Sequence, residues 1–432
     1  MKAKEIILLI FIIIGGVFLY HVQTGKIHFH WDWEEGFSPF EEDFVFEETE
    51  KIEPPFPSQM QVVNAHGNVH IEGTEEEIIT IKLKKKIWRN RKENAEKVSQ
   101  DLTLNIIRES SQIILTTNRD EFPKKNFRTH FTVTVPSEMS VKVRNAYGKV
   151  ESSHVGPLDI TNPHGEVEVS DIEGNLTLQN SYKDVQVTGV HSECQIETKY
   201  SSLRAQDISG DLRIRHRYGE IHLEKISGKV DIDGNNSEII GNHLGGPVMI
   251  ETSRKKVSLL DTGSAVIRGH HSPIEVRKVH KSLDIQDKYG RIHLEEIHGN
   301  LRVEGKSLEV YGKNIRGEKI SIASSYKDVE LEGFSGNTYI RLSHGDIILT
   351  PYPLTHPISA KGNYADITFN WPGKEKYPFE AQAEKGNLDW NLSAKLSYKK
   401  KNGVTLVKAF SEEKGKPSIS LTTRYGTIKV IR

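Results

Sequence analysis

The sequence predicts an all-β protein, a parallel β-solenoid (β-helix) of about 18 residues per coil with β-rich caps at both ends and one N-terminal transmembrane helix. The main evidence is a repeat that opens on a tyrosine or histidine turn and returns every 17 to 20 residues. Apolar residues follow the openers at offsets of 3, 5, 8, 12 and 14. The openers are Tyr147, His164, Tyr182, Tyr200, Tyr218, Asn236, Arg254, His271, Tyr289, Ser307, Tyr326, His344 and Tyr364.

A single repeat shows why these segments are predicted to be strands. In residues 218–235, YGEIHLEKISGKVDIDGN, Ile221 and Leu223 alternate with polar residues, and so do Val230 and Ile232. Alternation with a period of two indicates short strands with one buried face, and it does not match the 3.6-residue period of a helix. Each coil would bury its apolar columns against its neighbours, as in other repeat proteins.

Two further columns carry structural predictions. Glycine recurs ten residues after the opener, where we expect a turn with positive φ. The single cysteine, Cys194, falls in an apolar column and is predicted to be a small core residue instead of a reactive thiol. One cysteine also excludes a disulfide framework. The glycines of this column are Gly174, Gly210, Gly228, Gly246, Gly299 and Gly336.

The N-terminus, residues 1–22, is predicted to be a signal anchor. Lys2 and Lys4 precede an apolar run over residues 6–20, which favours a cytoplasmic N-terminus and an exported remainder. No A-x-A-like cleavage site follows, so an uncleaved anchor is favoured over a cleaved signal peptide. The expected location is a membrane that the chain crosses once, with the C-terminal domain exported.

Residues 23–57 are predicted to be an acidic, aromatic linker. Its core, residues 31–57, holds ten acidic residues, seven aromatic residues and one lysine. A stiff, self-repelling spacer and a partner-binding segment that folds on contact are both consistent with this composition.

Three regions follow the linker: an N-terminal β cap at residues 58–144, the repeats at 145–370 and a C-terminal β cap at 371–432. The stretch NAHGNVHIEG at 64–73 resembles the opener at Asn145. Residues 88–99 are expected to form a short helix or an exposed loop. Caps are expected because an open end of a solenoid exposes apolar core and unpaired strand edges.

These motifs together resemble the bacterial putative-adhesin domain family. The resemblance rests on the N-terminal membrane segment, the NAHGNVHIEG opener, the run TVTVPSEMSVKV at 132–143 and the repeated Y-G-x-I-x-L and S-Y-K-D-V units. It implies an exported bacterial β-solenoid without established enzymatic chemistry. With the predicted anchor, this places the chain in the bacterial cytoplasmic membrane, crossed once, with the C-terminal domain in the periplasm or outside the cell. The motifs are structural, so no functional residues carry over.

The opener column supplies the candidate ligand contacts. Stacked rings along one edge could hold sugar rings, or they could simply shelter the corner of each coil and pack on one another. The packing role is favoured because nearly every coil carries the feature. The candidate contacts are Tyr182, Tyr200, Tyr218, Tyr289 and Tyr326.

No catalytic residue, metal site or cofactor is predicted. The pairs His28/His30 and His270/His271 lack the neighbouring ligands of known zinc motifs. Glycan cleavage would need two carboxylates that converge on one coil face. The recurring acids instead look scattered over the coils, in turns where an aspartate bonds its own backbone. They are Asp171, Asp184, Asp207, Asp328 and Asp346.

The sequence therefore predicts a membrane-anchored, adhesin-like binding protein of the cell envelope that presents an extended surface to glycan or protein partners. A structural scaffold or polymerising solenoid is the first alternative, and a polysaccharide-cleaving β-helix enzyme is the second. The net charge of −1 and the lack of a strongly basic block argue against nucleic acid as a partner.

Overall fold

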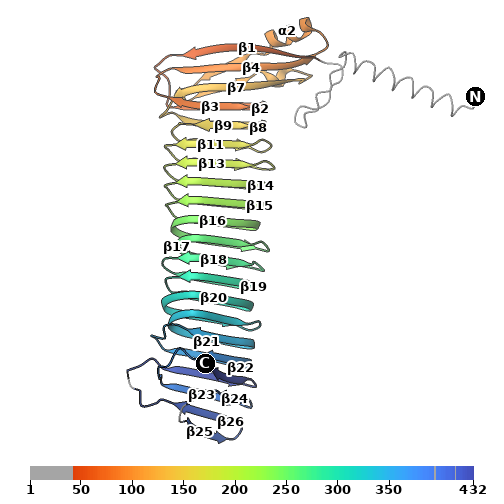
Figure 1. Ribbon diagram of the computed structural model, residues 1–432. Helices are drawn as coiled ribbons and strands as arrows, with labels where there is room; N and C mark the ends of the chain where they lie inside the picture. The colour runs from red at the N-terminus through yellow and green to blue at the C-terminus, as the bar shows by residue number, and fades with distance from the viewer. Residues whose placement is uncertain (1–41, 394–395, 414) are drawn as a thin grey trace, which may run out of the picture.

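The computed structural model describes residues 42–393, 396–413 and 415–432, in which 28 strands form one continuous sheet wound into a long stack (Figure 1). Neighbouring coils pair in parallel, with Leu212 opposite Val230 and Ile221 opposite Ile239, a shift of one 18-residue repeat. The predicted parallel β-solenoid is confirmed. The stack contains β8 (Ser140–Tyr147), β9 (Val150–Ser153), β10 (Leu158–Asn162), β11 (Val167–Ile172), β12 (Leu176–Asn180), β13 (Val185–Val190), β14 (Cys194–Ile208), β15 (Leu212–Ile226), β16 (Val230–Ser253), β17 (Val257–Gly269), β18 (Ile274–Val279), β19 (Leu283–Ile297), β20 (Leu301–Ser324), β21 (Val329–Pro351) and β22 (Ile358–Asn370).

The apolar columns point inward, as the repeat predicts. In the coil that opens at Tyr218, the residues at offsets 3, 5, 8, 12 and 14 are all buried, and the residues between them face solvent. Cys194 lies in the same interior, and burial raises the pKa of its thiol to about 12, so it is an inert core residue.

The predicted reason for the glycine column is wrong. Of its six members, all but Gly336 have a φ outside the left-handed region. They are glycines because successive coils touch backbone to backbone at this corner. A Cβ on Gly228 would lie 2.2 Å from the carbonyl oxygen of Gly210, and one on Gly246 would lie 2.1 Å from that of Gly228. No side chain fits at such a distance.

Left-handed backbone occurs instead at several openers, among them Tyr182 and Tyr200, and in an unbroken column seven residues after the opener. Eleven successive coils place a residue with φ between 53° and 68° at this corner. Most of these residues are not glycine, although a left-handed φ is uncommon for residues with a Cβ. The column is His154, Asp171, Gly189, Asp207, Lys225, His243, Asp261, Lys278, Glu296, Asn314 and Gly333.

The N-terminal end of the stack is closed by an outward excursion of the chain. The first coil consists of β2 and β3, which pair in parallel with β8 and β9 of the second coil. Residues 75–139, which connect the first coil to the second, leave the stack. Strands β6 and β7 then cover the first coil, and β5 and β4 pair antiparallel outside them. The elements are β2 (Gln59–His66), β3 (Val69–Thr74), β4 (Ile79–Arg89), α2 (Lys92–Asp101), β5 (Leu104–Arg108), β6 (Ile113–Thr117), η1 (Arg119–Glu121) and β7 (Phe127–Pro136).

Part of the segment predicted to be a linker is a strand. β1 (Glu42–Ile52) pairs antiparallel with the basic strand β4 and forms the outer edge of the cap. Charge complementarity explains the pairing, since Lys85 and Lys86 contact Glu48 and Asp43 at 2.9 and 3.5 Å. Phe44 and Phe46 of β1 pack beside α2. The spacer interpretation therefore does not hold for residues 42–52.

The C-terminal end is closed in the same way. After β22 the chain leaves the stack, and its last coil returns to lie directly on β22. The strands β23 and β24, which lie between β22 and the last coil in the sequence, then pair with the outer side of that last coil. The last coil is therefore not the tip of the stack, and the C-terminus lies between coils (Figure 1). The elements are β23 (Phe379–Glu384), β24 (Asn387–Trp390), β25 (Leu396–Lys401), β26 (Val404–Ala409), β27 (Ile419–Arg424) and β28 (Thr427–Ile431).

None of the helices among the described residues is long and apolar enough to span a bilayer. The anchor predicted at residues 1–22 and the linker residues 23–41 lie outside the described part of the chain.

Candidate functional site

The opener residues form stacks of aromatic rings along one corner of the solenoid. The longest described stack joins six rings with centroids 4.6 to 5.6 Å apart and planes within 8° of parallel. Tyr182, Tyr200 and Tyr218 belong to this stack and are about half exposed. Its members are His66, Tyr147, His164, Tyr182, Tyr200 and Tyr218.

The five predicted ligand contacts do not form one ladder. Asn236 and Arg254 interrupt the column after Tyr218. Tyr289 stacks on His271 at 4.5 Å, and Ser307 separates that pair from Tyr326. Tyr326 begins a third stack that continues through His344, Tyr364 and Tyr425, the last of these on the returning C-terminal coil.

The stacking limits what these rings can bind. A sugar ring binds an aromatic side chain through the flat face of the ring. Inside a stack, both faces of each ring are occupied by its neighbours at about 5 Å. The interior rings therefore offer solvent only their edges and hydroxyl groups. This geometry supports packing of the coil corner, while ligand contact by the five tyrosines stays a prediction.

A column of buried polar residues lies two positions before the openers, and the pattern of apolar residues does not reveal it. Asn162 donates from Nδ2 to the carbonyls of Gly148 and Glu166, and Asn180 donates to those of Asn162 and Gly165. These bonds satisfy backbone carbonyls at the sharp opener corner. The signal was visible as N-A-Y-G, N-P-H-G and N-S-Y-K.

His216 occupies this column and is fully buried. Its Nε2 lies 3.1 Å from the carbonyl oxygen of Ser201. A carbonyl oxygen can only accept a hydrogen bond, so Nε2 carries the proton. Its Nδ1 lies 2.7 Å from the hydroxyl of Ser237, which donates to it. Burial lowers the pKa of His216 and keeps the ring neutral.

This lowered pKa predicts a pH dependence of stability. The unfolded chain binds a proton at His216 below its ordinary pKa of about 6.5, whereas the folded protein resists that proton. The contribution of His216 to folding stability is therefore present above about pH 6.5 and is lost as the pH falls toward the lowered pKa of the folded state. The variant His216→Asn, which places in this coil the residue found at Asn180, should lose less stability between pH 7 and pH 5 than the parent. Urea unfolding at both pH values measures the difference. Parallel losses in the two proteins would contradict the assignment.

The corner seven residues after the opener carries alternating charges. Asp261 accepts hydrogen bonds from His243 and His280, each at 2.6 Å. These bonds hold the pKa of Asp261 below its usual range, and the bond from His280 has the larger effect. His154 lies 3.5 Å from Asp171. No group of three potential metal ligands with suitable geometry occurs in the described part of the chain. His270 and His271 contact each other, and His28 and His30 lie outside the described residues.

Some of the acids that look scattered in the sequence lie in register. Asp328, Asp346 and Asp366 stand at the same offset on successive coils, and burial together with the like charges of the other two raises the pKa of Asp346. Asp328 and Asp366 bond the backbone of the next coil and not their own turn: Asp328 accepts from the amide of Asp346 at 2.9 Å, and Asp366 accepts from that of Thr427 at 2.7 Å. Asp184 does the same for Ser202.

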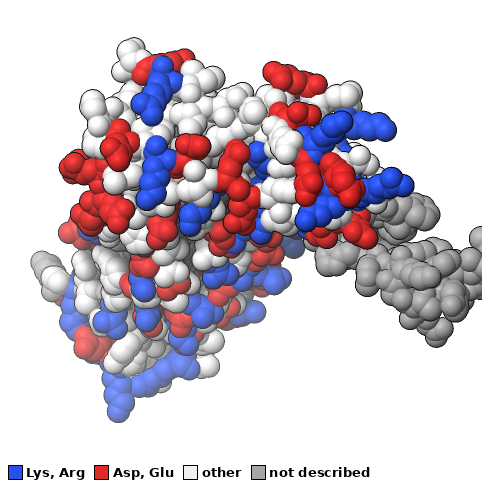
Figure 2. Space-filling view, turned by 90° about the horizontal axis from the view of Figure 1, so that it is seen from above, with Lys and Arg blue, Asp and Glu red and all other residues white. Residues whose placement is uncertain are grey.

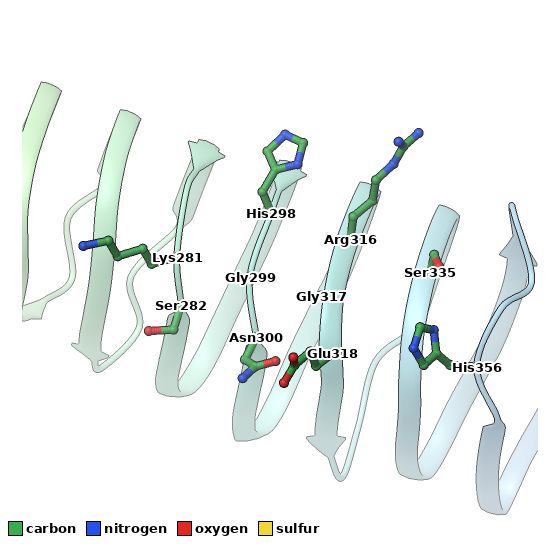
Figure 3. Close-up of a pocket in the computed structure, with 10 residues that line it drawn as sticks. All are labelled: Lys281, Ser282, His298, Gly299, Asn300, Arg316, Gly317, Glu318, Ser335 and His356. Carbon is green, nitrogen blue, oxygen red and sulfur yellow. The ribbon is translucent and has the colours of Figure 1, made fainter.

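The glycine corner leaves a furrow of about 640 Å³ along the stack (Figure 3). Its floor is bare because Gly299 and Gly317 carry no side chain. His298 and Arg316 project side by side from one edge of the furrow, and Glu318 lies on the other side of the glycine line (Figure 3). The furrow shares Ser282 and Asn300 with a wider groove on the adjoining side of the solenoid.

The fold and its corner columns define a capped parallel β-solenoid. The chain belongs to the Toastrack DUF4097 family, whose profile matches residues 58–237 and 261–431. This match confirms the resemblance to the bacterial putative-adhesin domain family. The gap between the two matched ranges includes Arg254, one of the openers at which the aromatic column is interrupted.

Several solved structures are similar to this chain. A putative cell adhesion protein from Clostridium sporogenes is 10% identical, with 90% of this chain and 99% of that chain covered and a TM-score of 0.16. A putative adhesin from Parabacteroides distasonis is 15% identical over 64% and 97% of the two chains, with a TM-score of 0.24. One from Bacteroides fragilis is 11% identical over 64% and 97%, with a TM-score of 0.22. No curated protein matches the chain in sequence.

Proposed function

We propose that this protein is an exported binding module of the bacterial cell envelope, anchored by its N-terminal apolar segment, that holds a glycan or protein partner along the side of its stack. The observation that carries the proposal is the contrast between covered ends and open sides. Antiparallel strands cover both ends, and the sides expose regular rows of polar and charged residues over the whole stack.

The edge strands support the sides as the binding surface. At one end the edge strand β1 carries five acidic residues, and at the other end β25 carries Lys399, Lys400 and Lys401. Charged edge strands discourage pairing with the edges of other sheets. Figure 2, which looks down on the N-terminal end, shows acidic and basic side chains interspersed and no large patch of one sign. These features favour a partner on the sides over end-to-end polymerisation.

Capture of a partner tests this function. The full-length chain in non-ionic detergent, immobilised through its C-terminus, is expected to retain an envelope polysaccharide or protein that a boiled sample of the same chain does not retain. Sugar analysis and mass spectrometry of the eluate identify which class is bound. Equal recovery from the folded and boiled samples would refute a binding function.

The same assay separates the two roles of the aromatic stack. In the triple variant Tyr182→Asn, Tyr200→Asn and Tyr218→Asn, asparagine tolerates the left-handed backbone that all three tyrosines adopt, and Asn236 already occupies this position. The variant removes three stacked pairs, since Tyr182 also stacks on His164. This loss should lower stability by about 1.5–4.5 kcal/mol, at roughly 0.5–1.5 kcal/mol per pair. Capture should persist. Lost capture with an unchanged melting temperature would instead show that the stack contacts the partner.

A further inference from the structure

One groove on the side of the solenoid differs from the rest of its surface. It has a volume of about 740 Å³ and crosses successive coils of β19, β20, β21 and β22. Its floor is shallow where β20 presents the small residues Ser321 and Ala323 to solvent. Larger side chains rise around this floor, and Arg302 is paired with Glu304 at 2.6 Å. They are the acids Asp284 and Glu304, the cations Arg302, Lys319, Arg341 and Lys361, and Tyr339.

Elsewhere on the solenoid, many basic residues are paired with acids on neighbouring coils. Lys149 lies 2.7 Å from Glu168, Lys256 lies 2.8 Å from Glu275, and Arg291 lies 3.3 Å from Glu309. Such pairs between adjacent strands are mildly favourable, and like charges in the same positions are unfavourable. Alternation of charge is therefore common on this surface, with exceptions such as Lys199 beside Arg217.

One column of the groove departs from this pattern. Arg341 stands in register with Lys361 on one side and with Ala323 on the other, at the strand spacing of about 4.8 Å. Both cations are exposed, and among the described residues neither contacts a carboxylate. Two adjacent, uncompensated cations repel each other, so a negative charge placed beside them from outside the chain would be stabilising.

Tyr339 gives the groove an aromatic surface of a different kind from the corner stacks. It lies two residues before Arg341 on the same strand, so both side chains point to the same side. Its neighbours in register are Ser321 and Ser359, and it is 47% exposed. No other ring among the described residues stacks on it, and a ring face is available to a ligand.

We propose that this groove binds an acidic polysaccharide, with Tyr339 as the platform for a sugar ring and with Arg341 and Lys361 as the contacts for its carboxylates. The proposal deepens the proposed function and rests on it. The guanidinium of Arg341 can hold a carboxylate through two parallel hydrogen bonds, and Lys361 adds a second charge. Ser321 and Ser359 offer hydroxyl groups beside the ring for the sugar hydroxyls. The furrow with Lys281 and Arg316 continues from the groove and offers cations for further units of the polymer.

Three polymers separate charge from ring recognition. The full-length chain in non-ionic detergent is titrated with polygalacturonate, with neutral dextran and with poly(glycerol phosphate), which has charge but no sugar ring. We expect polygalacturonate to bind more tightly than either of the others and its affinity to fall with added salt. Equal binding of dextran, or binding of poly(glycerol phosphate) as tight as that of polygalacturonate, would overturn the acidic-sugar assignment.

Variants locate the binding to the groove. The double variant Arg341→Gln with Lys361→Gln should bind polygalacturonate about tenfold more weakly, since two charge contacts are lost. The matched control Arg291→Gln with Lys313→Gln removes the same charge from cations that are paired with Glu309 and Glu332, and it should bind like the parent. Equal affinity of the two double variants would overturn the groove as the site.

In the variant Ala323→Glu, a loss of binding could not be explained by unfolding. The substitution places a carboxylate in register with Arg341 and so restores the pairing found on the other coils. Binding of polygalacturonate should be lost and the melting temperature kept or raised. If this variant still binds, the groove is not the site. The proposed function survives that result if the envelope partner is still captured, so the two failures can be told apart.

Discussion

Replacing Ile226 with aspartate is expected to lower the free energy of unfolding by about 3–5 kcal/mol, because a buried methyl-rich side chain is lost and a charge enters the core without a partner. Ile226 is 1% exposed and lies in the column eight residues after the opener, between Ile208 and Leu244 of the adjacent coils. Both neighbouring coils would lose their apolar contact at this position, and in a repeat protein the interface between neighbours supplies much of the stability.

Glu224→Asp provides the matched control, since it introduces the same residue two positions away in the same coil. Glu224 points to solvent on the outer side of β15. Its replacement should change the unfolding free energy by less than about 0.5 kcal/mol. Urea unfolding of both variants, followed by circular dichroism, measures the difference. Similar losses for the two variants would show that the assigned inward and outward positions are wrong.

The sequence alone predicts the stack because its strongest signals are local and repeated. Offsets of 3, 5, 8, 12 and 14 fix which side chains face inward, and parallel pairing with a shift of one repeat follows from them. The same signals do not reveal interactions between distant segments. Strand β1 was assigned to a linker because its acids look solvated until they are placed beside the lysines of β4.

The path of the chain at the ends was also beyond a repeat analysis. The opener at Tyr425 resembles all the others, and nothing in its own residues says that this coil inserts between β22 and the strands β23 and β24. The groove around Arg341 was missed for a related reason. Its uncompensated charge is visible only when residues 323, 341 and 361 are set in register and compared with the paired columns elsewhere.

The corners show a second limit of prediction from the sequence: the glycine positions are correct, but the physical reason predicted for them is wrong. The repeat suggests backbone conformation as the reason for the glycine column, whereas the left-handed residues stand three positions earlier or at the openers and are mostly not glycine. Steric contact between coils explains the glycines, and this contact has no signature in a single repeat. The two explanations predict different effects of adding a methyl group, and an adjacent pair of glycines can distinguish them.

Gly246→Ala is expected to destabilise the protein by about 3 kcal/mol, since its Cβ would lie 2.1 Å from the carbonyl oxygen of Gly228 and the coils would have to move apart. Gly245→Ala is the control: its nearest contact, with the carbonyl oxygen of Ile226 at 3.8 Å, is an ordinary van der Waals distance. Neither glycine has a left-handed φ, so backbone strain does not separate them. The Gly245 variant should be neutral or slightly stabilised, because alanine restricts the unfolded chain. Thermal unfolding of both proteins tests the contact explanation, and equal melting temperatures would show that the coils can part at this corner without cost.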